Sequence, residues 1–251
     1  MLIAEAARLG FNLSVTQLEQ MALHYQELIA WNERVNLTAI TAPNAAQIRH
    51  FADSLTVAAA LRDAGAAVEG RLLDVGSGGG FPGLPLKILW PNLQLTMLDS
   101  VAKKTAFLQH MATLYRERFA MKGLNVLTVR AEDAARDAHQ REQYAIVVAR
   151  GVAPLVVLAE YCLPFVKRGG WLAAPKKGMA LADEVAAAQN AVQKLGKGEI
   201  SIARFTLPTI GPNDEVGDER EPRQVVLIHK QSTTPPQYPR PAGTPAKEPL
   251  R

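Results

Sequence analysis

From residue 71 onward, short apolar runs alternate with segments whose apolar residues recur at helical spacing. Such alternation predicts strands and helices in turn, as in a sheet covered by helices on both faces. The predicted strands cover residues 71–75, 93–98, 125–130, 144–150, 171–175, 200–207 and 223–230, and the predicted helices cover 84–90, 102–119, 155–166 and 181–195. A polar loop separates the last two strands, which predicts an antiparallel closing pair. We therefore expect an α/β fold with a Rossmann-like, doubly wound sheet of seven strands.

The N-terminal part of the chain has only helical periodicity. Ser14 and Gln17 have the spacing of a capping box, and apolar residues repeat at helical spacing behind them. A second helical segment runs from Pro43 to Gly65. We expect residues 1–66 to form a helical extension of a domain that spans residues 67–230.

The C-terminal residues 231–251 differ in composition from everything before them. Six of these 21 residues are proline, and few are large and apolar. Burial of such a segment would not compensate for the entropy lost on ordering it. The composition therefore predicts a disordered tail.

The stretch RLLDVGSGGGFPG at residues 71–83 joins a predicted strand to a glycine-rich turn and a helix. Glycines let the backbone turn sharply and approach a ligand at the carboxyl end of a strand. Gly78, Gly80 and Gly83 satisfy the G-x-G-x-x-G dinucleotide pattern. A lone match to that pattern is weak, so the neighbouring acidic residues must decide the ligand.

Two acidic residues favour S-adenosylmethionine over NAD. Asp74 ends the first strand, where its carboxylate would repel a pyrophosphate but tolerate or indirectly orient a cationic sulfonium. Asp99 ends the second strand, where a carboxylate can accept hydrogen bonds from both ribose hydroxyls. The fuller pattern Asp74-x-Gly76-x-Gly78-x-Gly80 and the seven predicted strands, the last two antiparallel, are typical of S-adenosylmethionine-dependent methyltransferases.

Composition and charge narrow the class of protein further. The 251 residues carry a formal net charge of +4 with basic residues clustered in pairs, which modestly favours a polyanionic partner. The single cysteine, Cys162, excludes an internal disulfide framework and a thiolate metal cluster. No apolar run approaches the roughly 20 residues that span a bilayer. We expect a cytoplasmic, soluble monomer without membrane contact or bound metal.

The residues after the fourth strand restrict the methyl acceptor. A pyrimidine carbon would need a cysteine nucleophile, and an exocyclic amino group is usually met by an Asn/Asp-Pro-Pro-aromatic loop. Residues 149–154 read ARGVAP instead. What remains fits an atom that already carries a free lone pair, such as N7 of guanine. Arg150 in this loop is a donor suited to a carboxylate, a phosphate or guanine O6.

Several motifs, in order, resemble the bacterial small-subunit rRNA (guanine-N7)-methyltransferase family, RsmG or GidB. They are WNERVNLTAI at 31–40, RHFADSL at 49–55, LLDVGSGGGFPGLPLKI at 72–88, VRAED at 129–133, VVARGVAPL at 147–155 and APKKG at 174–178. The resemblance covers roughly residues 20–230. It implies a class I S-adenosylmethionine-dependent methyltransferase fold and methylation of one guanine of 16S rRNA, with the assembled small ribosomal subunit as the substrate.

The resemblance also implies roles for individual residues. Around the cofactor it places Gly76, Phe81, Asp99, Ala131, Glu132 and Arg150, beside Asp74, Gly78 and Gly80 of the glycine turn. It implies catalytic roles for Arg150 and His50, and RNA or active-site contacts for Asp53, Arg130, Lys176, Lys177 and Arg220. Where the family commonly has proline, this chain has Gly79, which leaves the rigidity of the turn open.

Three other functions stay open on the sequence. The first is an NAD-dependent oxidoreductase that uses Gly78, Gly80 and Gly83, although Asp74 and the lack of a Tyr-Lys or His constellation argue against it. The second is a non-enzymatic RNA-binding or ribosome-assembly factor on the same fold. The third is a methyltransferase that acts on a protein or a small molecule.

Overall fold

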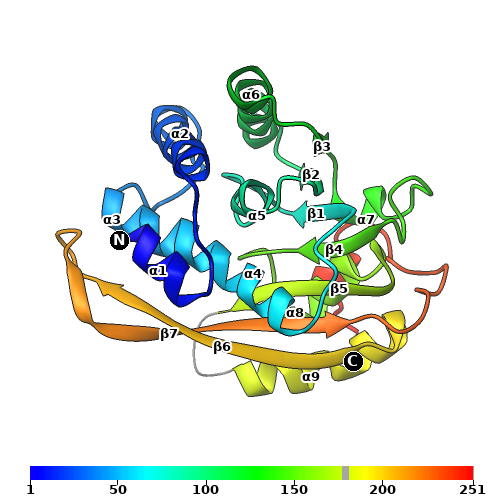
Figure 1. Cartoon of the computed structure of the whole chain (residues 1–251). Coiled ribbons are helices and arrows are strands. Elements are labelled where there is room, and N and C mark those ends of the chain that lie inside the picture. The colour runs from blue at the N-terminus through cyan, green and yellow to red at the C-terminus, as the bar shows by residue number, and fades with distance from the viewer. Residues whose placement is uncertain (177–180, 251) are drawn as a thin grey trace.

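A seven-stranded mixed sheet runs through the molecule (Figure 1). The computed structural model describes residues 1–176 and 181–250. The strands are β1 (Arg71–Val75), β2 (Gln94–Asp99), β3 (Leu124–Thr128), β4 (Tyr144–Val148), β5 (Val166–Lys176), β6 (Glu199–Ile210) and β7 (Val216–His229). Their order is β3-β2-β1-β4-β5-β7-β6, with β1 to β5 parallel and β7 antiparallel to β5 and β6. This arrangement confirms the predicted doubly wound sheet.

Helices cover both faces of the sheet. They are α1 (Leu2–Arg8), α2 (Val15–Asn32), α3 (Pro43–Ala46), the π-helical turn η1 (Gln47–Ala52), α4 (Asp53–Asp63), α5 (Gly83–Leu89), α6 (Ala102–Phe119), α7 (Ala131–Ala134), α8 (Leu155–Cys162), α9 (Leu181–Gly196) and α10 (Thr244–Lys247). Because successive residues of a strand point to opposite faces, Leu72 and Leu73 of β1 enter different hydrophobic clusters. The cluster around Leu72 includes α2, η1, α4, α5 and α6, and the cluster around Leu73 includes α8 and α9.

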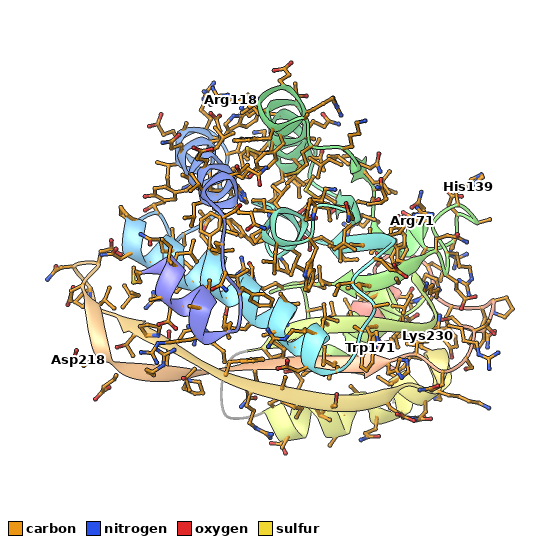
Figure 2. The ribbon with its side chains drawn as sticks, viewed as in Figure 1. Arg71, Arg118, His139, Trp171, Asp218 and Lys230 are labelled. Carbon is orange, nitrogen blue, oxygen red and sulfur yellow. The ribbon has the colours of Figure 1, made fainter. Side chains whose placement is uncertain are left out.

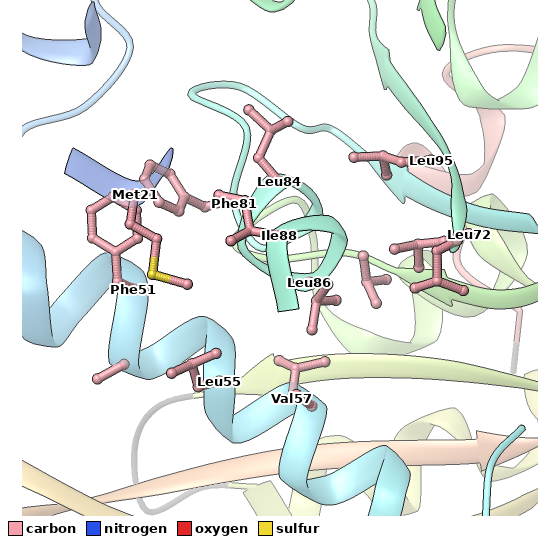
Figure 3. Packing of buried hydrophobic residues seen from close by; sticks show 14 of the residues in the cluster. Met21, Phe51, Leu55, Val57, Leu72, Phe81, Leu84, Leu86, Ile88 and Leu95 are labelled. Atoms are coloured by element: carbon pink, nitrogen blue, oxygen red, sulfur yellow. The ribbon is translucent and has the colours of Figure 1, made fainter. Parts of the chain in front are cut away.

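The N-terminal helices belong to the first of these clusters. Figure 3 shows Met21 of α2 and Phe51 of η1 beside Phe81 of the glycine turn. The predicted capping box is present, since Ser14 Oγ accepts from the Gln17 amide and Gln17 Oε1 accepts from the Ser14 amide. The second predicted helix is the unbroken run of α3, η1 and α4, whereas α1 had no clear sequence signal. One cluster joins this extension to the sheet, so a domain boundary at residue 66 stays a prediction.

Several elements differ in length from the sequence prediction. Helix α8 ends at Cys162 rather than residue 166, because Pro164 has no N–H to continue the helical hydrogen bonds, and β5 then begins at Val166. Strands β6 and β7 form a long hairpin whose turn is residues 211–215, so the polar residues expected in a loop lie within β7. Exposed Asp218 points away from the molecule near this turn (Figure 2).

The C-terminal residues also differ from the prediction, because residues 231–250 lie against the domain in defined contacts. Arg141 donates hydrogen bonds to the carbonyls of Thr234, Pro235 and Tyr238. Leu250, 9% exposed, joins the second hydrophobic cluster. Composition suggested disorder because it does not reveal these contacts. The segment is held by its own backbone carbonyls, and the donor to them is Arg141, which lies much earlier in the chain.

Candidate active site

A cavity of about 420 Å³ opens at the carboxyl ends of β1 to β4, and we call it the first cavity. The loops that follow these strands line it with residues 75–79, 98–101, 129–132 and 150–152. His50 of η1 also lines it. Because the strand order reverses between β1 and β4, a crevice at this edge is the expected ligand site of a doubly wound sheet.

The glycine turn forms the floor of the first cavity. Gly76 has φ +70°, and a Cβ built on it would lie 2.6 Å from Val152 Cγ2. A side chain at this position would therefore be strained and would also collide with the loop after β4. The Gly76 and Ser77 amides donate to the Leu98 carbonyl at 2.7 and 3.1 Å, which ties the turn to the end of β2.

Asp99 lies at the end of β2, where the sequence predicted it. Its carboxylate is buried, with Oδ2 accepting from the Gly78 amide at 3.1 Å and Oδ1 from the Val101 amide at 2.9 Å. Each carboxylate oxygen can accept more than one hydrogen bond, so both can still receive donors from a ligand. The two amides fix the carboxylate against the cavity that it lines.

Asp74 and Gly80, two of the predicted cofactor residues, do not line the first cavity. The fully buried Asp74 instead accepts a hydrogen bond from the Gly83 amide at 3.0 Å, at the start of α5. Burial raises the pKa of this carboxyl to about 7. In a dinucleotide-binding protein, the amides at the start of the helix after the glycine turn would donate to a pyrophosphate. Here the Gly83 amide donates to Asp74 instead, which argues against the NAD alternative.

A stack of three rings supports the turn from the side of the N-terminal helices. Phe81 lies between His24 and His50, with ring centroids 4.4 and 4.5 Å away and nearly parallel planes. His24 is fully buried, and its Nε2 lies 2.7 Å from the Gly79 carbonyl, to which it donates. This hydrogen bond holds the turn at Gly79.

His24 was not predicted as a site residue. The sequence nevertheless pointed to His24, because this residue shares a face of α2 with Met21 and Leu28. An apolar residue is expected at such a position. A polar side chain on a buried helix face must find a partner inside the protein. Here the partner is the glycine turn.

The burial of His24 makes the stability of the fold depend on pH. Burial lowers the pKa of His24 from 6.5 to about 4. The folded state therefore holds the imidazole ring of His24 in its neutral form. The contribution of this neutral ring to the stability of the fold is complete above pH 6.5 and is lost as the pH falls toward 4. We expect the free energy of unfolding of the protein, minus that of His24→Gln, to be about 3 kcal/mol smaller near pH 4 than near pH 7.5.

Denaturant unfolding of both proteins across this pH range tests the expectation. The raised pKa of Asp74 acts with the opposite sign, since its contribution is lost as the pH rises toward 7. Asp74 is present in both proteins, so its contribution cancels in the difference. A difference that does not change with pH would show that His24 is not held neutral by the fold.

Arg150 extends from the loop after β4 into a cluster of charged groups from the N-terminal helices. Its Nη1 donates to Asp53 Oδ2 at 3.0 Å and to the Arg49 carbonyl at 3.1 Å. Its Nη2 lies 3.4 Å from Nδ1 of His50. Asp53, 2% exposed, also lies 3.1 Å from Nε of the buried Arg223 on β7, so one carboxylate joins two arginines.

A second cavity, of about 410 Å³, adjoins the first. It is lined by Ile40, Arg49, His50, Asp53, Arg150, Gly151, Pro175 and Lys176. His50, Arg150 and Gly151 line both cavities. A ligand in one cavity would therefore meet a ligand in the other beside the guanidinium of Arg150.

The structure brings most of the predicted site residues together, but not all. Ala131, Glu132 and Arg130 line the first cavity, and Lys176 lines the second. Lys176 Nζ also donates to the Ala153 carbonyl and to Glu184, which holds the loop after β4. Lys177 lies outside the described residues.

Arg220, a predicted RNA contact, is placed elsewhere. It lies on β7 and pairs with Glu5 of α1, with Nη2 2.6 Å from Oε2, and it lines neither cavity. Within residues 1–176 and 181–250, no cluster of histidine, cysteine or acidic side chains could hold a metal ion. No helix in the same ranges is long and apolar enough to cross a bilayer.

Comparisons with known proteins agree with this geometry. The family model GidB, described as rRNA small subunit methyltransferase G, matches residues 17–209. The ribosomal RNA small subunit methyltransferase G of Roseiflexus sp. (strain RS-1) is 46% identical over 250 residues, which is 100% of this chain and 99% of the relative. The protein of the same name from Halalkalibacterium halodurans is 43% identical and covers 96% of this chain and 94% of its own length.

A solved structure adds a comparison of folds. A branched-chain polyamine synthase mutein from Thermus thermophilus, in complex with N4-aminopropylspermidine and 5'-methylthioadenosine, superposes with a TM-score of 0.53. It is 14% identical, and the match covers 84% of this chain and 64% of that one, so the likeness concerns the fold alone. The sheet order and the family together confirm the predicted class I S-adenosylmethionine-dependent methyltransferase fold. The chain belongs to the GidB family of rRNA small subunit methyltransferases G.

Proposed function

We propose that this S-adenosylmethionine-dependent methyltransferase methylates N7 of a guanine in the 16S rRNA of the small ribosomal subunit. The observation that carries the proposal is that the two cavities meet at His50, Arg150 and Gly151. Methyl transfer is an in-line displacement, so the donor and the acceptor must be held against each other across one boundary. The shared residues provide such a boundary.

The first cavity fits S-adenosylmethionine. Gly76 presents bare backbone to the cavity, since a Cβ there would lie 2.6 Å from Val152 Cγ2, and the carboxylate of Asp99 can accept hydrogen bonds from ribose hydroxyls. Glu132, which also lines the cavity, offers a second carboxylate to neutral donors such as an amino group. When bound, the cofactor supplies an activated methyl group on a sulfonium, and these residues would hold it.

The second cavity fits a nucleobase with its phosphate. Ile40 and Pro175 provide apolar surface for a planar ring, while Arg49 brings positive charge to the phosphate. Guanine N7 carries a free lone pair, so no general base has to remove a proton before attack. Arg150 Nη2 would donate to O6 beside N7, while Nη1 stays bonded to Asp53.

The electrostatics of this boundary suit a product that is cationic at N7. A guanidinium alone would repel the positive charge that develops on the methylated base. Asp53 lies 3.0 Å from Arg150 and balances its charge. Arg150 can therefore act as a hydrogen-bond donor to the base with little repulsion, and His50 supports it through the contact at Nδ1.

The names of the relatives support small-subunit rRNA as the substrate. The reaction would then occur in the cytoplasm, where small subunits are assembled. Both cavities are built from one chain, so a monomer would be sufficient. A non-enzymatic assembly factor would have no use for two cavities that meet, and turnover separates that alternative from the proposal.

Methyl incorporation tests the proposal. Labelled S-adenosylmethionine would be supplied with small subunits from a strain that lacks the enzyme, and in parallel with protein-free rRNA. N7-methylguanosine would then be mapped by borohydride reduction and aniline cleavage. We expect one new cleavage site in 16S rRNA and none in large-subunit rRNA, which serves as the control. Intact cofactor binding with no transfer to either small-subunit substrate would contradict the proposed acceptor.

A further inference from the structure

The C-terminal residues 231–250, here called the strap, contact the wall of the first cavity. We propose that the strap positions Glu132 in this cavity and thereby sets the affinity of the protein for S-adenosylmethionine. The inference rests on the proposed function in one respect, since it takes the first cavity as the cofactor site. It does not depend on which acceptor is methylated.

Charged side chains of the domain hold the strap in place. Arg141 donates to three of its carbonyls, those of Thr234, Pro235 and Tyr238. Arg240 of the strap pairs with Glu160 of α8, with Nη2 2.7 Å from Oε2, and Glu160 is 1% exposed. A buried carboxylate requires such a partner, so the course of the strap past α8 is fixed by the fold.

One backbone amide of the strap reaches the cavity wall directly. The Gly243 amide donates to Glu132 Oε1 at 2.9 Å. Glu132 lies in α7, just after β3, is 2% exposed and lines the first cavity. Its other oxygen, Oε2, accepts no hydrogen bond from the described residues. The strap thus fixes one carboxylate oxygen and leaves the second for a donor on the ligand.

The strap also contacts α8, which contributes another residue to the wall of the first cavity. Glu160, which Arg240 holds, is followed in the chain by Tyr161, and Tyr161 lines the first cavity. The strap thus contacts Glu132 directly and, on a second helix, the residue next to Tyr161. Packing alone would not require this arrangement, because Leu250 and Tyr238 already attach the strap to the second hydrophobic cluster.

A hydrogen bond to Glu132 favours ligand binding by limiting side-chain rotation before the ligand arrives. Without the amide, the carboxylate would have to be ordered by the ligand itself, which weakens binding. Glu132 is held by a charge-assisted bond, and such bonds contribute more than neutral ones. Loss of the bond is therefore expected to appear in the dissociation constant of the cofactor.

The variant Gly243→Ala tests this inference with little change in packing. Gly243 has φ +85°, which alanine adopts poorly, but no atom lies within 4 Å of the added Cβ. The substitution should therefore move the amide without a collision. By calorimetry we expect S-adenosylmethionine to bind about tenfold more weakly, and KM for the cofactor to rise with kcat unchanged. Gly65→Ala is the matched control, because Gly65 has φ +74° and equal space but contacts neither cavity.

A double-mutant cycle with Glu132→Ala separates positioning from general stability. If the strap acts through Glu132, Gly243→Ala should weaken binding no further once Glu132 is removed. Additive losses, or unchanged binding in Gly243→Ala, would overturn the inference. Because calorimetry needs no RNA, a failure of the guanine assay leaves this readout intact, whereas a wild-type protein that binds no S-adenosylmethionine would overturn both proposals.

Discussion

Replacement of Gly76 by aspartate is expected to abolish binding of S-adenosylmethionine, raising the dissociation constant at least about 100-fold. The left-handed backbone at φ +70° disfavours any side chain, and the new Cβ would lie 2.6 Å from Val152 Cγ2. Either the turn or the loop after β4 must move. Both of them line the first cavity, and the added carboxylate would occupy part of it. Isothermal titration calorimetry with the cofactor measures the effect.

The other end of β1 offers a matched control. Gly70 has φ +82°, is exposed, and has no atom within 4 Å of an added Cβ. Gly70→Asp therefore introduces the same residue with a similar backbone strain but far from the cavity. We expect it to bind the cofactor like the wild type. Micromolar binding retained by Gly76→Asp would show that the turn does not form the floor of the cofactor site.

The sheet and the glycine turn could be predicted because their signals are local. β4 is buried at all five positions and β1 at four of five, so their sequences are apolar without alternation, as parallel strands require. Gly76 directly follows β1 and Asp99 ends β2, and the carboxyl ends of parallel strands share one edge. Their place in the cavity therefore follows from chain order alone.

Asp74 shows how far such local reasoning reaches. The sequence predicted a carboxylate at the end of β1 that tolerates or indirectly orients a cationic sulfonium. A strand residue can point to either face, however, and Asp74 points toward the Gly83 amide behind the turn. The direction depends on how α5 packs, which the motif does not specify.

The charged cluster around Arg150 shows which contacts between distant segments the sequence could not predict. The motifs placed Arg150 and Asp53 near the active site, and the structure joins them. The second partner of Asp53 is Arg223 of β7, which lies beyond the motifs of the resemblance. No local pattern links α4, the loop after β4 and β7, so this network appears only when the antiparallel strand is placed next to β5.

This network makes the substitution Arg150→Met informative about catalysis. Methionine keeps much of the side-chain volume but removes the donor that lines both cavities. We expect kcat to fall on the order of 10²–10³, as when a donor at a reacting centre is removed. Asp53 keeps its pairing with Arg223, so we expect the protein to fold with a loss of about 3 kcal/mol. Single-turnover methylation and denaturant unfolding measure the two effects.

Arg223→Met provides the comparison that separates catalysis from stability. Arg223 pairs with the same carboxylate and is 4% exposed, but it lines neither cavity. Its removal should cost a similar free energy of unfolding, because Asp53 again loses one of two partners. We expect its kcat to stay within about threefold of the wild type when the folded protein is assayed. Equal losses of kcat in both variants would mean that the ion pairs act only by holding the start of α4 in place, whereas a loss confined to Arg150→Met would assign the guanidinium itself to the methylated base.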